Sequence, residues 1–126
     1  MANQTIAQIA NQLVDNCRSG NEMQGLDDLY ADNAVSVEAM ANPATGSAEV
    51  RSREGIRAKH EWWNGAFEVH EMNVEGPFLH GENQFSVIFE LDSTDKASNE
   101  RTRMKEVAVY TVANNKIARE EFFYGT

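Results

Sequence analysis

The sequence predicts an α+β fold in which a curved antiparallel sheet packs against three helices. Helical spacing of apolar residues fills most of the first half of the chain, and strand-like alternation fills the second half. Asn114 and Asn115 mark a tight turn between the last two strands, because asparagine tolerates the positive φ angles of such turns. A sheet folded around helices tends to leave a pocket between them.

The first two elements are predicted to be helices. One apolar stripe recurs at three- and four-residue steps: Ile6, Ile9, Ala10, Leu13 and Cys17. Gly20 can end this helix in the left-handed conformation. The same period returns at Met23, Leu26 and Leu29, and Glu22 lies in the first turn, where a negative charge meets the positive end of the helix dipole.

The middle of the chain is predicted to be strand, loop and helix. Alternation from Ala34 to Met40 indicates a strand, whereas Ala41 to Val50, with its proline and glycine, indicates a loop. Ser52 suits the N-cap of a third helix. One face of that helix is predicted to carry Ile56, His60, Trp63 and Phe67.

The rest of the chain is predicted to form four long strands with polar connections. In order, these are a strand from Glu68 to Val74, a corner at Glu75-Gly76-Pro77, a strand from Phe85 to Leu91, a connection from Asp92 to Asn99, and strands from Arg101 to Ala113 and from Lys116 to Tyr124. Helices followed by an antiparallel meander are typical of the α+β class.

Composition limits the expected partners and compartment. The 126 residues, which we expect to form one domain over 1–126, carry 11 basic and 20 acidic side chains and a net charge of −9. This charge repels phosphate backbones and anionic lipids, so neither nucleic acid nor a membrane surface is an expected partner. A single cysteine and the lack of a secretory signal or bilayer-spanning stretch favour a cytoplasmic location.

Glu106 is the acid in the most informative position. Strand alternation places it on the same face as four core-type residues: Met104, Ala108, Tyr110 and Val112. An unpaired carboxylate there loses hydration worth several kcal/mol, so it takes up a proton near neutral pH or finds a donor. Two structural alternatives stay open: an exposed edge strand, or a structural hydrogen bond to a cross-strand neighbour.

Glu38 is the second candidate acid. It shares a small, partly polar strand face with Ala34, Ser36 and Met40, next to the predicted loop. Two carboxyl groups in different surroundings can act as a charged base and a neutral acid, which is what proton transfer beside a carbonyl requires. A solvent-facing glutamate in an acidic protein is the structural alternative.

His60 is the third candidate, because its helical register turns it toward the core or a cavity, where it serves as a proton shuttle or as a buried neutral imidazole. The histidines lack metal-ligand spacing, so we expect no metal and no cofactor. Trp63 and Tyr110 are expected to line the pocket, because their polar hydrogens need partners when buried.

The sequence has one dense basic run, which consists of Arg51, Arg53, Arg57 and Lys59. We interpret it as a solvated helix face that pairs with acids such as Glu54 and Glu61.

Three segments carry a resemblance to a known family: LDDLYADNA at 26–34, REGI at 53–56 and YTVANNKI at 110–117. They resemble the nuclear transport factor 2-like superfamily and, within it, the SnoaL-like proteins. The resemblance implies a cone-shaped, cystatin-like α+β fold with a mixed curved sheet, a homodimer, and a deep apolar pocket. The residues that we expect to line that pocket are Trp63, Phe67, Met104, Tyr110 and Phe122.

The resemblance also bears on the chemistry. Glu38 looks like the catalytic carboxylate of ketosteroid isomerases, which lies eight residues into a segment that starts here at Ala31. Glu106 looks like their hydrogen-bonding acid. The tyrosine that those enzymes carry on the first helix has no counterpart between Ala2 and Ser19.

Two functions are therefore compared. The first is a cofactor-independent enzyme that isomerises, cyclises or dehydrates a small apolar carbonyl compound. The second is a non-catalytic dimer that binds a small hydrophobic ligand or a protein, with the convex sheet as its interface.

Overall fold

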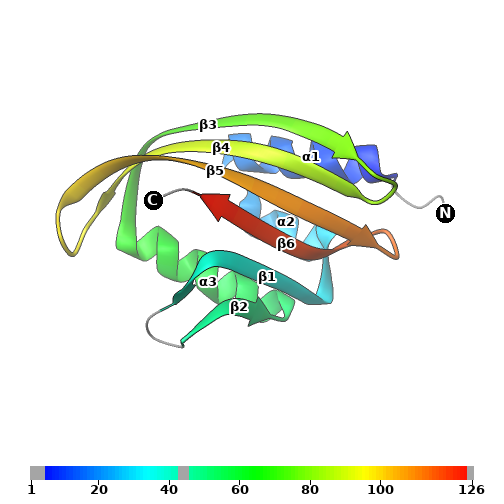
Figure 1. Ribbon diagram of the computed structural model, residues 1–126, viewed down its shortest axis with the longest axis horizontal. Helices are drawn as coiled ribbons and strands as arrows, with labels where there is room; N and C mark the ends of the chain where they lie inside the picture. Colours follow the sequence, from blue (N-terminus) through cyan, green and yellow to red (C-terminus); the bar gives the residue numbers. More distant parts are fainter. Residues whose placement is uncertain (1–4, 43–45, 125–126) are drawn as a thin grey trace.

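The computed structural model describes residues 5–42 and 46–124, which form three helices and a six-stranded sheet (Figure 1). In chain order these are α1 (Ile6–Ser19), α2 (Glu22–Leu29), β1 (Tyr30–Asn42), β2 (Ser47–Arg51), α3 (Arg53–Ala66), β3 (Phe67–His80), β4 (Gln84–Asp95), β5 (Glu100–Ala113) and β6 (Lys116–Tyr124). The predicted α+β class is confirmed.

The sheet is mixed, curved and unclosed. Its strand order is β2-β1-β6-β5-β4-β3, with β1 and β6 parallel and every other neighbouring pair antiparallel. The three helices lie on one face of this sheet, with α1 and α2 behind its upper strands and α3 behind β1 (Figure 1). The sheet therefore has a face that the helices cover and an opposite face that they leave open.

Local signals place the helix ends. Thr5 caps α1 through a capping box: its side chain accepts from the Gln8 amide at 3.2 Å, and the Gln8 side chain accepts from the Thr5 amide at 2.8 Å. Gly20 ends α1 with a left-handed φ of 78°. Ser52 caps α3 by accepting from the Gly55 amide at 3.0 Å. The ends at Gly20 and Ser52 agree with the predicted ones, whereas the cap at Thr5 was not predicted.

The core lies between α1, α2 and the covered face of the sheet. Strand alternation buries one face of β4 as predicted: Phe85, Val87, Phe89 and Leu91. Ile9 and Leu13 of α1 join this cluster, because the apolar stripe of α1 packs toward β3 and β4. Each fully buried side chain of this size contributes about 1.5–3 kcal/mol to folding.

The predicted loop from Ala41 to Val50 is wrong over most of its described part. β1 runs on to Asn42, and residues 47–51 form β2, which pairs antiparallel with β1, for example Val37 with Glu49. Pro43, Ala44 and Thr45 lie outside the described residues. The small, polar composition concealed β2, because an edge strand needs no apolar run when its neighbour supplies the backbone hydrogen bonds.

Further boundaries also differ from the predictions. β1 begins at Tyr30 and not at the predicted Ala34. The expected corner at Glu75-Gly76-Pro77 is a register shift inside β3, which continues to His80 as an edge strand, where proline is tolerated. The first half of the expected connection after Leu91 extends β4 to Asp95, where Thr94 pairs with Arg101 of β5. Phe67 begins β3 instead of ending α3. Cross-strand pairing decided these boundaries.

Candidate functional site

A cavity of about 760 Å³ lies between the helices and the covered face of the sheet. All five residues expected in a pocket line it: Trp63, Phe67, Met104, Tyr110 and Phe122. The three candidate catalytic residues, Glu38 from β1, His60 from α3 and Glu106 from β5, line the same cavity. The fold therefore brings these side chains together from three separate elements.

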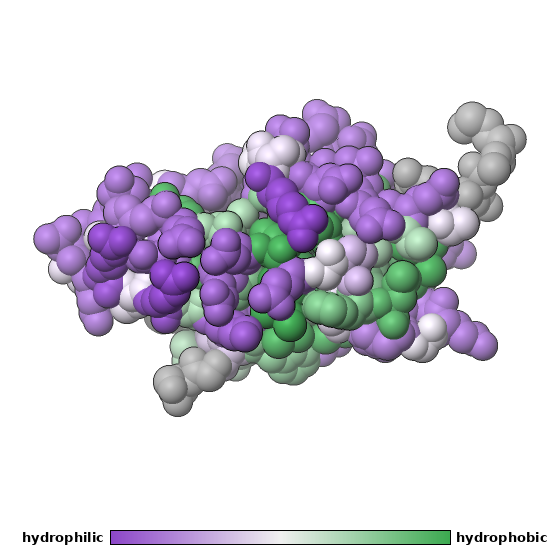
Figure 2. All heavy atoms as spheres, turned by 90° about the horizontal axis from the view of Figure 1, so that it is seen from above, coloured by the Kyte–Doolittle hydropathy of each residue, from purple (hydrophilic) through white to green (hydrophobic). Residues whose placement is uncertain are grey.

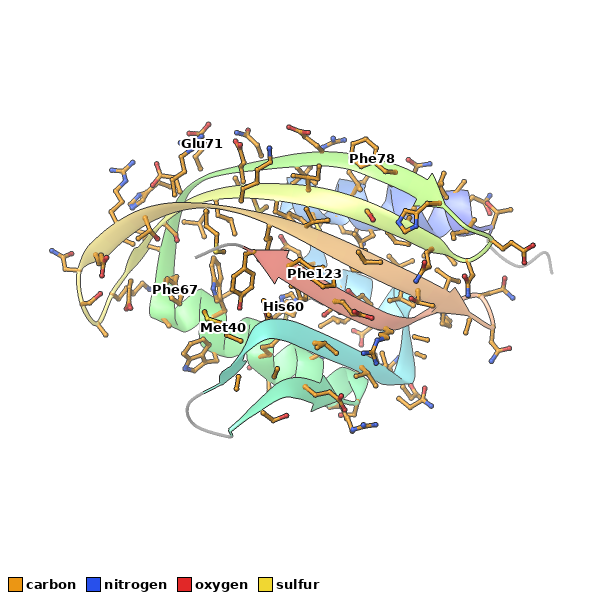
Figure 3. The ribbon with its side chains drawn as sticks, in the orientation of Figure 1. Met40, His60, Phe67, Glu71, Phe78 and Phe123 are labelled. Atoms are coloured by element: carbon orange, nitrogen blue, oxygen red, sulfur yellow. The ribbon has the colours of Figure 1, made fainter. Side chains whose placement is uncertain are left out.

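The cavity has an exposed mouth and a buried inner end. At the mouth, Met40 and Trp62 are 60% and 62% exposed. At the inner end, Tyr110 and Glu120 are 3% and 1% exposed. Figure 3 shows Met40, His60 and Phe67 around the space between α3 and the sheet.

Lys59 and Glu38 form an ion pair near the mouth, with Lys59 Nζ 2.8 Å from Glu38 Oε1. The Lys59 ammonium also donates to Ser36 Oγ at 2.5 Å and lies 4.9 Å from the centre of the Phe122 ring. The Lys59 side chain is 18% exposed and the Glu38 side chain 30%. Lys59 is the only lysine or arginine among the described residues that line the cavity.

This position corrects the prediction for the basic run. The sequence predicts Lys59 on the solvated side of the third helix, but it lies three residues after Ile56, so the helix turns it toward β1 and the cavity. The interpretation holds for Arg57, which pairs with Asp27 and lies 3.5 Å from Glu54. Arg53 pairs with Asp32 instead of a residue of its own helix.

Glu106 lies in the cavity wall between the two ends. Burial, followed by the negative charge of Glu38, raises the pKa of its carboxyl to about 7, while the positive charge of Lys59 acts in the opposite direction. No hydrogen bond or ion pair joins this carboxyl to another described side chain. At neutral pH it is therefore divided between a charged form and a neutral form that can donate a hydrogen bond.

His60 lies on the α3 side of the cavity. Burial lowers the pKa of its imidazole below the ordinary value, which outweighs the opposing charge of Glu120, so the ring is mostly neutral at pH 7. Trp63 and Phe67 stack beside it with ring centres 5.1 Å apart and planes 18° from parallel. These rings form an apolar wall of the cavity.

Tyr124 lies on the same cavity wall as Glu106, with which it pairs across β5 and β6. Burial raises the pKa of its phenol, and the charges of Glu38 and Glu106 raise it further. Tyr124 therefore stays neutral at physiological pH and supplies a hydroxyl group near the mouth.

Sequence reasoning missed the polar group at the inner end. The Tyr30 hydroxyl, at the start of β1, donates to Glu120 Oε2, and Glu120 Oε1 is a buried oxygen without a partner among the described residues. Tyr110 pairs with Glu120 across β5 and β6. A signal for Glu120 was available, because alternation along β6 places it on the face that carries Phe122.

Other kinds of site find no support in the described ranges. No three His, Cys, Asp or Glu side chains in residues 5–42 and 46–124 are arranged to hold a metal ion. Burial raises the pKa of the Cys17 thiol to about 12, so it is not a ready nucleophile. None of the described helices has the length and apolar character needed to cross a bilayer.

Comparisons with known proteins agree with this architecture. A SnoaL-like domain model matches residues 1–124. A Mesorhizobium loti protein described as a SnoaL-like polyketide cyclase is 40% identical, with a TM-score of 0.89 over 96% of this chain and 100% of that one.

Two more distant structures share the fold. An NTF2-like protein from Burkholderia xenovorans is 16% identical, with a TM-score of 0.74 over 100% of this chain and 93% of that one. A Mycobacterium tuberculosis protein crystallised with estradiol-17β-hemisuccinate is 18% identical, with a TM-score of 0.73 over 97% of this chain and 95% of that one. No curated protein matches the sequence significantly. The family match confirms the resemblance in the sequence: the chain belongs to the SnoaL-like domain family.

Proposed function

We propose that this protein is a cofactor-independent acid–base enzyme that moves a proton next to the carbonyl group of a small apolar compound. The products would be those of isomerisation, cyclisation or dehydration. One observation carries the proposal: Glu38 and Glu106 line the same largely apolar cavity, but only Glu38 has a charged partner. Carboxyl groups held so differently can serve as base and acid in one reaction.

Each carboxyl group has a defined role. Glu38 removes a proton from the carbon next to the carbonyl, and the electron pair of that C–H bond moves toward the carbonyl oxygen. Neutral Glu106 donates a hydrogen bond to the oxygen as negative charge develops there. The proton on Glu38 then returns to the same or a neighbouring carbon, so the enzyme is regenerated. His60, Trp63 and Tyr110 position the substrate.

The volume of the cavity and the descriptions of similar proteins support a small, apolar substrate. A volume of about 760 Å³ is within the range of small-molecule sites. The Mesorhizobium loti protein is described as a polyketide cyclase, and the Mycobacterium tuberculosis protein holds a steroid derivative. Another similar fold is a designed binder of 17-OHP. We infer that this chain also takes a small, mostly apolar guest.

Hydrogen–deuterium exchange of 2-tetralone, a small apolar ketone with acidic protons beside its carbonyl, tests the reaction. NMR in D₂O should show exchange catalysed by the wild-type protein, and Glu38→Gln and Glu106→Gln should each slow it by about 10²- to 10⁴-fold. Glu71→Gln is the matched control, because Glu71 projects outward from β3, away from the cavity (Figure 3). Equal rates in all four proteins would contradict the proposal.

A non-catalytic binding dimer is the second candidate. On the open face of the sheet, Ile88, Val107 and Phe123 form a cross-strand row, and Phe123 is 52% exposed. Figure 2 shows apolar residues gathered along one side of a largely hydrophilic surface. Burying such a row against a second copy would remove it from water.

Sedimentation tests the dimer and exchange tests the chemistry. We expect a dimer at micromolar concentration that Phe123→Asp converts to a monomer, whereas a wild-type monomer would contradict the proposed interface. A wild-type protein that binds 2-tetralone without exchanging its protons would favour the binding function over the enzyme.

A further inference from the structure

Two polar groups at the inner end of the cavity have no hydrogen-bond partner among the residues that the structure describes. Oε1 of Glu120 is buried without a hydrogen bond, although Tyr30 holds the other oxygen of the same carboxyl group. No hydrogen bond joins the Tyr110 hydroxyl to another described residue, although Tyr110 is almost fully buried. Both residues line the cavity. A buried carboxylate oxygen normally finds a partner, because leaving it unpaired costs free energy.

The two groups are adjacent and complementary. Tyr110 and Glu120 are register partners on β5 and β6, so their side chains project from the same side of the sheet. The carboxylate can only accept a hydrogen bond, whereas the phenol can donate one. They do not bond directly to each other, so a group that both accepts and donates could join them. A hydroxyl group has this capacity and an ether or a methyl group does not.

The site is rigid enough to select such a group. The Phe85 ring stacks on Tyr110 with centres 4.9 Å apart and planes 16° from parallel, which fixes the orientation of the phenol. Tyr30 fixes the carboxyl group of Glu120 through its second oxygen. Groups held by packing and by other hydrogen bonds recognise a ligand with little loss of entropy.

We propose that the inner end of the cavity is a subsite for a hydroxyl group of the ligand, which accepts from Tyr110 and donates to Glu120. This inference rests on the proposed function for the presence of a small apolar guest and narrows its class to hydroxylated compounds. The hydroxyl group anchors the buried end of the molecule. The reacting carbonyl then lies toward Glu106 and Glu38, nearer the mouth.

Two probes of nearly equal shape test the subsite: 2-naphthol, which has a hydroxyl group, and 2-methylnaphthalene, which has none. Calorimetric titration should show that the wild-type protein binds 2-naphthol roughly tenfold more tightly, the expected effect of one good hydrogen bond pair. Tyr110→Phe and Glu120→Gln should each reduce this preference to less than about twofold. Tyr124→Phe is the matched control, because it removes a hydroxyl group from the same cavity near the mouth.

Several outcomes would overturn the subsite. Equal affinity of the wild-type protein for both probes would mean that water or a proton satisfies the two groups. Loss of the preference in Tyr124→Phe, or its survival in Tyr110→Phe, would place the hydroxyl group elsewhere. Tighter binding of cationic 2-naphthylmethylamine, lost only in Glu120→Gln, would show that the subsite recognises a positive charge. Tyr110→Phe keeps the test valid if Glu120→Gln fails to fold.

The subsite and the reaction can fail separately. A hydroxyl preference without any exchange of 2-tetralone would keep the subsite and remove the enzyme. Exchange that depends on Glu106, without a hydroxyl preference, would keep the enzyme and remove the subsite.

Discussion

The mouth and the inner end of the cavity hold a carboxylate in different ways. At the mouth, Glu38 pairs with the Lys59 ammonium and is still in contact with water. At the inner end, Glu120 is almost fully buried and, among the described residues, pairs only with the neutral phenol of Tyr30, which leaves one oxygen without a partner. An ion pair near water changes stability little, whereas a buried carboxylate depends strongly on every donor. Substitutions at the inner end should therefore change the free energy of unfolding, and substitutions at the mouth should change the pKa of Glu106.

Glu106 lies between the mouth and the inner end, and charges at both places affect the pKa of its carboxyl group. The charges of Glu38 and Glu120 raise its pKa, and Lys59 lowers it, but none of them hydrogen-bonds to it. With a pKa of about 7, its protonation changes near neutral pH.

The largest expected effect is on stability at alkaline pH in Glu106→Gln. The folded pKa of about 7 lies above the unfolded value of 4.5, so the favourable contribution is complete below 4.5 and is lost as the pH rises through 7. The wild-type protein should lose about 3 kcal/mol relative to Glu106→Gln between about pH 4.5 and about pH 8.5. Urea unfolding of both proteins at each pH measures this difference. A difference that does not vary with pH would show that Glu106 titrates normally.

The second-largest expected effect is a loss of stability caused by a substitution at the inner end. Tyr30→Phe removes the one donor to Glu120 in the described part of the chain and should lower the free energy of unfolding by about 2 kcal/mol. Replacing both partners with apolar residues, in Tyr30→Phe/Glu120→Met, should recover much of this loss, because no unpaired charge is left. Urea unfolding of the two single variants and the double variant measures the coupling. Additive losses would mean that the hydrogen bond contributes nothing.

The smallest expected effect is a change in the pKa of Glu106 caused by a substitution at the mouth. Lys59→Met removes the positive charge that lowers the pKa of Glu106, so that pKa should rise above its wild-type value of about 7. Lys59→Arg keeps the charge and should leave the pKa nearly unchanged. NMR titration of the Glu106 carboxyl carbon follows all three proteins. An unchanged pKa in Lys59→Met would show that Lys59 acts on Glu38 alone.

The order and type of most elements could be predicted from the sequence, because they depend on local spacing and on caps such as Thr5, Gly20 and Ser52. Phe85 to Leu91 show the same point for a strand, since period-two alternation was enough to identify their buried face. β2 could not be predicted in this way. Its residues form a strand only because the edge of β1 is available to pair with them.

The candidate site was predictable one residue at a time but not as an arrangement. Glu106 and His60 stood out because each is polar on an apolar face. Lys59 did not, because a lysine in a basic run is typical of a solvated helix and its position relative to Ser36 and Glu38 depends on how α3 packs against β1. No local signal joined Tyr30 to Glu120, which lie 90 residues apart.

The sequence by itself determined the α+β class, the faces of the strands and the presence of acids on a buried face, because these follow from periodicities over a few residues. The tertiary structure alone decided which acid has a cation, which has only a phenol and which has neither. These pairings require side chains from distant segments to lie close together in the folded protein. Charge and burial act over a few ångströms of space, whatever the separation along the chain.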